Sequence, residues 1–143
     1  MTGQLVRSAC VSLTLSDAVA GIRLSRPGAG NAIDDAVVRG LAAAMDEIET
    51  AQARAVLVSG AGAHLTVGGD LDHLRAQVDR LSAELGELVP MYHDVLCRLA
   101  GLDIPVVCAA QGVVAGGGLG LLWCSDVVVA SAEGGSGAVK RPW

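Results

Sequence analysis

The sequence predicts an α/β protein, and three patterns in the first 60 residues lead to this prediction. Two short stretches, at 11–15 and 19–25, have the composition and spacing of paired strands. Residues 37–48 then carry apolar positions at helical spacing. The run RAVLVS at 54–59 is apolar almost throughout, as in a strand covered on both faces of a sheet. A strand, helix and strand in this order require a crossover connection, which is typical of α/β architecture.

The predicted hairpin and the first helix are joined by a turn. Asp17 lies between the two strands, and residues 26–31 form the turn that follows them. Asp34 is placed to cap the helix, because an Asp side chain at this position accepts a hydrogen bond from a backbone N–H of the first turn. Five apolar residues of the helix are expected to face the core: Val37, Val38, Leu41, Met45 and Ile48.

A leucine-rich stretch after the loop at 60–69 predicts a long helical region. Its apolar residues recur at alternating spacings of three and four: Leu71, Leu74, Val78, Leu81, Leu85 and Leu88. Pro90 is expected to start or kink a second helix, which ends at Gly101. A coiled-coil seam would have the same spacing, but Pro90 ends the pattern early, so a packed surface helix is favoured.

The chain is organised around residues 104–126, IPVVCAAQGVVAGGGLGLLWCSD. The apolar run after Pro105 predicts a buried strand, the three adjacent glycines a tight turn, and the residues from Leu119 to Cys124 a buried helix. Residues 127–130 predict a further buried strand. Each glycine in a helix or strand costs about 0.5–1 kcal/mol relative to Ala, so the triplet indicates a need for backbone without Cβ atoms. Such a turn lets a ligand reach the unpaired N–H groups at a helix N-terminus.

The same stretch has an alternative interpretation as a membrane-spanning segment. Residues 104–124 carry no charge, are about long enough to cross a bilayer, and contain overlapping GxxxG spacings. Against this stand Pro105, Gln111, the clustered glycines and acidic flanks at Asp103 and Asp126. We therefore favour the strand, turn and helix.

Composition argues against several classes of function. A formal net charge of -5 and 2% aromatic residues argue against a nucleic-acid partner. The four cysteines form no CxxC pair and the three histidines have no metal-ligand spacing with them, so no metal site is expected. We interpret the cysteines as small buried residues in a reducing cytosol. The N-terminus has no apolar leader, so we expect a cytoplasmic protein with no membrane partner.

Two motifs resemble the signature regions of a known family. The stretch HLTVGGDL at 64–71 and the segment 105–126 are similar to those of the enoyl-CoA hydratase/isomerase (crotonase) family, and RP at 26–27 followed by NAI at 31–33 is similar to its early turn. The resemblance implies repeated ββα units, with a spiral sheet and covering helices. It ends near Glu133, so residues 1–133 are expected to be an N-terminal portion of the family domain, apparently truncated. Residues 134–143 are then an unmatched flexible tail.

The resemblance also implies a site. The family stabilises an enolate or a tetrahedral oxyanion, formed from a CoA thioester carbonyl, with two backbone N–H groups, and the motif positions place these at Gly69 and Gly117. Eight further residues are expected to shape the site or to contact coenzyme A and the acyl-pantetheine arm: Gly30, Asn31, Ala32, Gly68, Asp70, Leu71, Asp72 and Gly116. Two alternatives stay open: the glycines only allow tight turns, and Asp70 only caps the helix that begins at Leu71.

The acid and base of such a site depart from the family pattern. Hydratases of the family carry a Glu two residues beyond the glycine triplet, where this chain has Gly120, and a second Glu that would fall near Lys140. The sequence resembles family branches with Gly at the first position, which include dehalogenase-like members. His64, Glu133 and Ser136 are weak substitutes, since a loop histidine is usually solvated and Ser136 has no nucleophile-elbow context.

The implied function is chemistry on a CoA or acyl-carrier thioester, of the hydratase or isomerase type, with an enolate held by two N–H groups. Coenzyme A enters as part of the substrate, and no separate cofactor is expected. A complete family member is expected to form a homo-oligomer of the trimer type. The alternative is a catalytically silent fragment or binding module, because no positioned carboxylate is found at Gly120.

Overall fold

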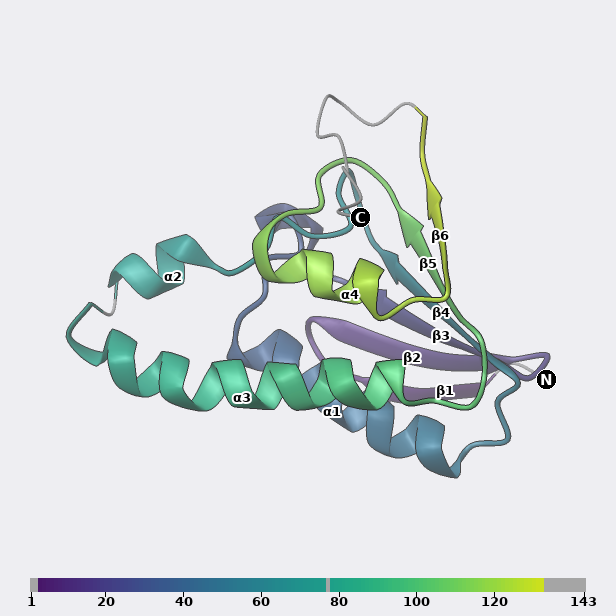
Figure 1. Cartoon of the computed structure of the whole chain (residues 1–143). Helices are drawn as coiled ribbons and strands as arrows, with labels where there is room; N and C mark the ends of the chain where they lie inside the picture. The colour runs from purple at the N-terminus through teal and green to yellow at the C-terminus, as the bar shows by residue number, and fades with distance from the viewer. Residues whose placement is uncertain (1–2, 77, 133–143) are drawn as a thin grey trace.

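The computed structural model describes residues 3–76 and 78–132, which form one six-stranded sheet with helices on one of its faces (Figure 1). The strands lie side by side in chain order: β1 (Gly3–Arg7), β2 (Val11–Ser16), β3 (Val19–Leu24), β4 (Ala55–Gly60), β5 (Val106–Ala110) and β6 (Val127–Ala130). The first two pairings are antiparallel, and those from β3 to β6 are parallel. The predicted α/β class is confirmed.

The predicted hairpin is β2 and β3, and strand β1 at its outer edge was not predicted. Asp17 and Ala18 at the hairpin turn both have positive φ angles, 49° and 63°. A two-residue turn with positive φ at both positions matches the twist of the flanking strands. The register pairs Leu13 with Ile22, so the apolar residues of both strands reach the same face of the sheet.

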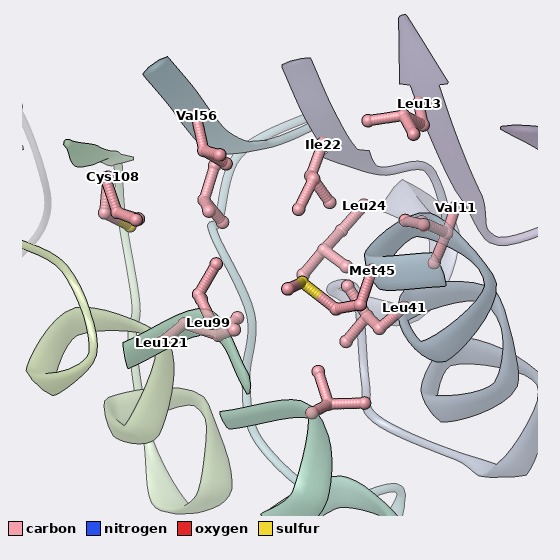
Figure 2. Packing of buried hydrophobic residues seen from close by; sticks show 14 of the residues in the cluster. Val11, Leu13, Ile22, Leu24, Leu41, Met45, Val56, Leu99, Cys108 and Leu121 are labelled. Atoms are coloured by element: carbon pink, nitrogen blue, oxygen red, sulfur yellow. The ribbon is translucent and has the colours of Figure 1, made fainter. Parts of the chain in front are cut away.

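Helix α1 (Asp35–Thr50) packs on that face over β1, β2 and β3. The cap is as predicted, because the Val37 N–H donates to Asp34 Oδ1 at 2.9 Å. All five residues of the predicted apolar stripe are buried. Figure 2 shows Met45 of α1 packed among side chains from the sheet and near Leu99 of the third helix.

The leucine-rich stretch differs from its prediction in two ways. It is divided into α2 (Leu71–Ala76), a 3-10 turn (Val78–Arg80) and α3 (Leu81–Ala100), and α3 continues through Pro90 instead of starting there. Pro90 is exposed and removes only one hydrogen bond of a long helix. The predicted stripe from Leu71 to Leu88 is also not buried; in α3 the fully buried residues are Val95 and Leu99.

The segment 104–126 folds as β5, a 3-10 turn (Gly116–Gly118) and the short helix α4 (Leu119–Trp123), as the sequence predicts. This stretch is therefore not one continuous helix, and in the described part of the chain no helix is long and apolar enough to cross a membrane. The predicted burial holds for Leu121 and Leu122, but Trp123 is 66% exposed.

The second face of the sheet has no covering layer among the described residues (Figure 1). Strand β6 was predicted to be buried, yet Val127 and Val129 are more than half exposed. Both residues lie in register with the outward side of β5, opposite Val107 and Ala109. The expectation of a sheet covered on both faces is therefore wrong for the chain described, and half-exposed Leu57 of β4 shows the same.

The cysteines do not share one environment. Cys108 is fully buried, and burial raises the pKa of its thiol to about 11. Cys10 and Cys124 are half-buried, and Cys97 is exposed on α3. The interpretation of all four as buried residues is wrong for Cys97, because α3 presents it to a hollow instead of the core.

Candidate functional site

The two glycine motifs lie against each other. Thr66 and Val114 form a parallel bridge between the loops, and the Ala115 N–H donates to the carbonyl of Thr66 at 3.2 Å. Gly68 has a φ of +96°, and a Cβ atom there would lie 2.7 Å from the Ala115 carbonyl oxygen. A side chain at Gly68 would therefore separate the loops, which explains why glycine is needed there.

Gly69 is held by the turn that follows β3. The Ile33 N–H donates to the Gly68 carbonyl at 2.7 Å, and the Asp70 N–H donates to the Ile33 carbonyl at 3.1 Å. These two bonds make Gly69 the bridge partner of Ile33 and leave its own N–H on the other side of the strand-like segment. No acceptor for this N–H is found within residues 3–76 and 78–132.

Gly117 lies in the first turn of the 3-10 helix that leads into α4. N–H groups of a first helical turn have no partner inside the helix, and the described chain supplies none to Gly117. The carbonyl of the same residue accepts a hydrogen bond from the Tyr92 hydroxyl of α3 at 2.8 Å. Burial raises the pKa of Tyr92, so it stays a neutral donor.

Both glycines line one hollow, which we call the glycine pocket, with a volume of about 260 Å³. Leucines of α2 and α3 form its apolar wall, which explains why the predicted stripe is not in the core. The lining residues are Ile33, Asp34, Gly69, Asp70, His73, Leu74, Leu85, Leu88, Val89, Tyr92 and Gly117.

A second hollow, the α3–α4 pocket, has a volume of about 480 Å³ and shares Val89, Tyr92 and Gly117 with the first. It extends from Gly117 between the two helices. Its remaining lining residues are His93, Leu96, Cys97, Ala100, Gly116, Gly120, Trp123 and Cys124.

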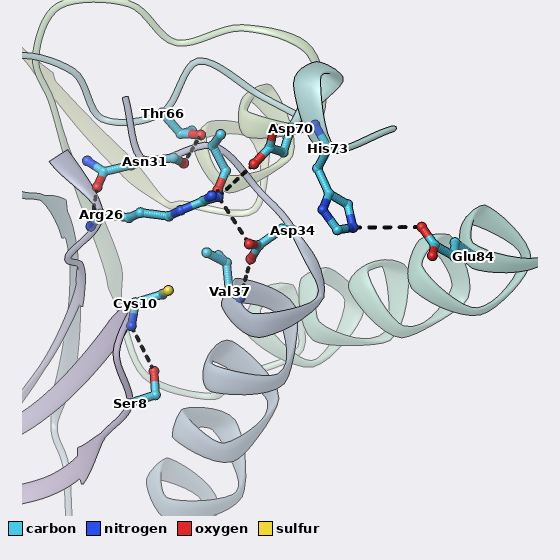
Figure 3. A network of polar contacts seen from close by, with 11 residues as sticks. Ser8, Cys10, Arg26, Asn31, Asp34, Val37, Thr66, Asp70, His73 and Glu84 are labelled. Atoms are coloured by element: carbon cyan, nitrogen blue, oxygen red, sulfur yellow. Dashed lines mark hydrogen bonds and ion pairs between the residues drawn. The ribbon is translucent and has the colours of Figure 1, made fainter. Parts of the chain in front are cut away.

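Arg26 joins the start of α1 to the start of α2 (Figure 3). One guanidinium nitrogen lies 2.9 Å from Asp70 Oδ2 and 3.1 Å from Asp34 Oδ2, and it also donates to the Ala32 carbonyl. Asp70 Oδ1 accepts from the His73 N–H at 3.0 Å, so Asp70 caps α2 as one alternative predicted. This backbone hydrogen bond and the Arg26 contact lower the pKa of Asp70, which keeps it ionised.

Asn31 is fully buried and organises the surrounding loops with its side chain. Its amide nitrogen donates to the carbonyls of Ala61 and His64 at 2.8 and 2.9 Å, and its Oδ1 accepts from the Arg26 N–H at 2.8 Å. Its φ of 54° lies in the left-handed region, which Asn tolerates better than most residues. The sequence did not indicate this role for the Asn31 side chain.

The other expected contact residues are spread around the site. Gly30 has a φ of +61° and packs on Val67, and Ala32 is buried. Leu71 and Asp72 are exposed on α2, and neither lines the two pockets. Of the eight residues expected to shape the site or contact the thioester, Asp70 reaches the glycine pocket and Gly116 the α3–α4 pocket.

His64 was expected to be solvated, and this is wrong. It is half-buried, lies outside both pockets, and its Nδ1 accepts a hydrogen bond from the Val113 N–H at 3.1 Å. The ring therefore holds the loop that leads to the glycine triplet. Glu133, Ser136 and Lys140, named in the search for an acid or base, lie outside the described residues.

The pocket walls carry titratable groups that the sequence did not single out. Tyr92, His73 and His93 are on helices, where their spacing indicated only helical structure.

The carboxylates that line the glycine pocket, Asp34 and Asp70, are both paired with Arg26. A Cβ atom at Gly120 would lie 2.6 Å from Leu96 Cδ1, so a larger residue there requires the Leu96 side chain to move.

Comparison with known proteins now identifies the family. The family model described as enoyl-CoA hydratase/isomerase matches residues 14–138. The chain belongs to the enoyl-CoA hydratase/isomerase family. The resemblance of the two glycine motifs and the crotonase-like fold class are thereby confirmed.

Family members whose names state different activities are similar to this chain. A 1,2-epoxyphenylacetyl-CoA isomerase of Escherichia coli is 33% identical over 77% of this chain and 43% of that protein. A 4-chlorobenzoyl coenzyme A dehalogenase of Arthrobacter is 28% identical over 83% of this chain and 44% of that protein. An enoyl-CoA hydratase structure from Shewanella pealeana matches with a TM-score of 0.77 and 26% identity, covering 84% of this chain and 46% of that one. The chain thus spans less than half the length of these family members.

Proposed function

We propose that this chain binds an acyl thioester of coenzyme A, or of an acyl carrier, at the glycine pocket and stabilises the enolate formed from it. The Gly69 and Gly117 N–H groups donate to the thioester oxygen. Removing one such donor in other enzymes costs about 2.7–4 kcal/mol of transition-state stabilisation. The reaction is of the hydratase or isomerase type, and coenzyme A takes part as a portion of the substrate.

One observation carries this proposal. Gly69 and Gly117 come from loops 48 residues apart in the sequence, yet both line the same pocket, and both N–H groups lack a partner in the described chain. Unpaired backbone N–H groups beside an apolar hollow are unfavourable unless a ligand or water satisfies them. Two of them on one small pocket support recognition of a single oxygen atom.

The remaining assignments extend from this pair. Gly68 and Gly116 give the two loops their shape, and the turn formed by Gly30, Asn31 and Ala32 contacts coenzyme A through backbone groups. The acyl-pantetheine arm passes Asp70, Leu71 and Asp72 at the start of α2. We place the protein in the cytoplasm, as part of a homo-oligomer, and we assign it no metal and no cofactor of its own.

A second candidate function is thioester binding without turnover. It is favoured by the state of the carboxylates, since Asp34 and Asp70 are both held by Arg26 and position 120 is a glycine packed on Leu96. An ionised carboxylate in a salt bridge is a weak general base. Under this alternative the two N–H groups bind the carbonyl, but no group in the described chain removes a proton.

The test uses a matched pair of substitutions at Gly117. Pro is tolerated in the first turn of a helix because it lacks only an N–H that has no helical partner, so Gly117→Pro deletes the donor. Gly117→Ala keeps the N–H, and its Cβ atom would meet Tyr92 at 3.4 Å, an ordinary contact. We expect butyryl-CoA to bind Gly117→Ala nearly as well as the parent and Gly117→Pro at least about tenfold more weakly, as measured by calorimetry.

The infrared carbonyl band of a ¹³C-labelled thioester supplies a direct readout of the same contact. The band should shift to lower frequency on binding to the parent and to Gly117→Ala, because hydrogen bonds weaken the C=O bond. Equal affinity and an equal shift in Gly117→Pro would refute the assignment of this donor. Turnover of crotonyl-CoA then separates the two candidate functions: hydration supports the enzyme, and binding without hydration supports the silent module.

A further inference from the structure

The α3–α4 pocket contains a thiol and an imidazole that the proposed enolate chemistry does not use. Cys97 and His93 are four residues apart on α3, so they share one face of the helix, and Cys97 Sγ lies 3.4 Å from His93 Nε2. Both side chains are exposed, and both line the pocket. When Nε2 is unprotonated, it can accept the thiol proton.

The other cysteines provide a contrast within the same chain. Cys108 is buried in the core, where burial raises the pKa of its thiol. Cys124 faces the same pocket from the end of α4, but it is half-buried, and no hydrogen bond of its thiol is found among the residues that the structure describes. A nearby imidazole is a recognised way to activate a thiol, whereas buried thiols are inert. Cys97 is thus the thiol best placed to react.

The position of the pocket suggests what Cys97 meets. The two pockets share Gly117, so an acyl thioester with its carbonyl oxygen at Gly117 in the glycine pocket can extend its acyl chain into the α3–α4 pocket. An α,β-unsaturated acyl group carries a soft electrophilic carbon two bonds from the carbonyl carbon. Thiols add to such carbons without an oxidant or any other co-reactant.

We propose that Cys97, with His93 as its proton acceptor, is a covalent site for α,β-unsaturated acyl thioesters. The choice of a thioester rests on the proposed function. The sulfur forms a bond to the β-carbon, and the carbon–carbon double bond supplies its π electrons to form an enolate at the carbonyl. The proton taken from the thiol by His93 is then delivered to the α-carbon. The product is a saturated thioether that retains the whole thioester, and nothing is released.

The experiment uses the 143-residue chain and crotonyl-CoA as the probe. Intact mass spectrometry should show a gain equal to one crotonyl-CoA, and peptide mapping should place it on Cys97. Cys97→Ser should abolish the adduct, whereas the matched change Cys124→Ser in the same pocket should leave it. His93→Gln, which cannot accept the proton, should slow adduct formation at least about tenfold. Both α3 changes are at exposed positions, so circular dichroism should show an unchanged fold.

Butyryl-CoA, which is saturated, separates failure of this inference from failure of the proposed function. If butyryl-CoA binds but crotonyl-CoA forms no adduct, or modifies Cys10 and Cys124 as fast as Cys97, the covalent site is wrong and the proposed function stands. If butyryl-CoA does not bind, the proposed function and the thioester adduct fail together. Labelling with iodoacetamide then tests the thiol pair alone: preferential labelling of Cys97 that His93→Gln slows supports it, and equal labelling overturns it.

Discussion

Helices α1 and α3 have similar apolar periodicity, but their apolar faces contact different parts of the molecule. Seven of the 16 residues of α1 are buried against the sheet, whereas α3 buries two of its 20. The second half of α3 is fixed to α1, because Arg98 pairs with Asp46 and Glu49 at 2.7 and 2.8 Å. In its first half, Leu85 and Leu88 line the glycine pocket instead. Spacing therefore predicts that a helix forms, and the surrounding structure decides whether its apolar face becomes core or binding surface.

The largest expected difference between the helices is in stability. Leu41→Ala in α1 removes a side chain that is 2% exposed, so the free energy of unfolding should fall by about 2–5 kcal/mol. Leu85→Ala, the same change at a half-exposed position of α3, should cost less than about 1 kcal/mol. Urea unfolding followed by circular dichroism measures both. Similar losses for the two variants would mean that the first half of α3 is part of the core.

The two helices also differ in how their first turns are capped, and we expect this difference to have an intermediate effect on stability. Asp34 caps α1 and pairs with Arg26, whereas Arg80 at the start of α3 makes no side-chain cap. Asp34→Ala should lower the free energy of unfolding by about 1–2 kcal/mol, and Arg80→Ala should change it by less than about 0.5 kcal/mol. A comparable loss for Arg80→Ala in thermal or urea unfolding would contradict the assignment of α3 as an uncapped helix.

A smaller effect is expected at the contact between α3 and the glycine triplet. Tyr92→Phe removes the hydroxyl that donates to the Gly117 carbonyl, and the free energy of unfolding should fall by about 1 kcal/mol. Butyryl-CoA affinity should fall as well, because this bond orients the triplet. Unchanged affinity, measured by calorimetry beside the parent, would show that the triplet keeps its shape without α3.

The smallest expected effect is on the pH dependence of folding stability, through the Asp70 side chain at the start of α2. The pKa of Asp70 is lowered by the His73 N–H and by Arg26, so its contribution to stability is present above the ordinary carboxyl pKa of about 3.9. It is lost as the pH falls through the lower folded-state pKa. Asp70→Asn keeps a capping side chain without the charge.

This pH dependence is measured as a difference between two proteins. The parent should be more stable than Asp70→Asn at pH 6, and the gap should close as the pH falls below about 4. Carboxylates common to both proteins cancel in the comparison. A gap that stays constant down to pH 2.5 would mean that the Asp70 charge contributes nothing to folding.

The sequence predicted local structure better than it predicted which side chains are buried. The Asp34 cap, the hairpin around Asp17 and the glycine turn before α4 depend on local chemistry, and all are present. Strand β1 was missed because it gains its stability from pairing with β2. Burial of Trp123 and Val129 was predicted from apolar spacing alone, and both are exposed because no covering layer lies over them in the described chain.

In the candidate site, too, the sequence predicted the local motifs but not the contacts between distant residues. Gly69 and Gly117 were predicted from motifs, and the structure places both on one pocket, although their role as donors remains a proposal. Tyr92, His93 and Arg26 were not predicted to shape the site. Their spacing or turn position gave no sign of it, since a hydrogen bond between residues 25 apart is not encoded in a local pattern.

The sequence by itself determined the α/β class, the helix cap at Asp34, the glycine turns and membership of the family. These follow from backbone conformations and short-range patterns that a few neighbouring residues fix. Only the tertiary structure decided that leucines of α3 line a pocket, that the buried Asn31 side chain links the surrounding loops, and that the face of α3 carrying His93 and Cys97 lines a pocket shared with Gly117. Such contacts depend on how distant segments pack, so a periodic sequence pattern cannot specify them.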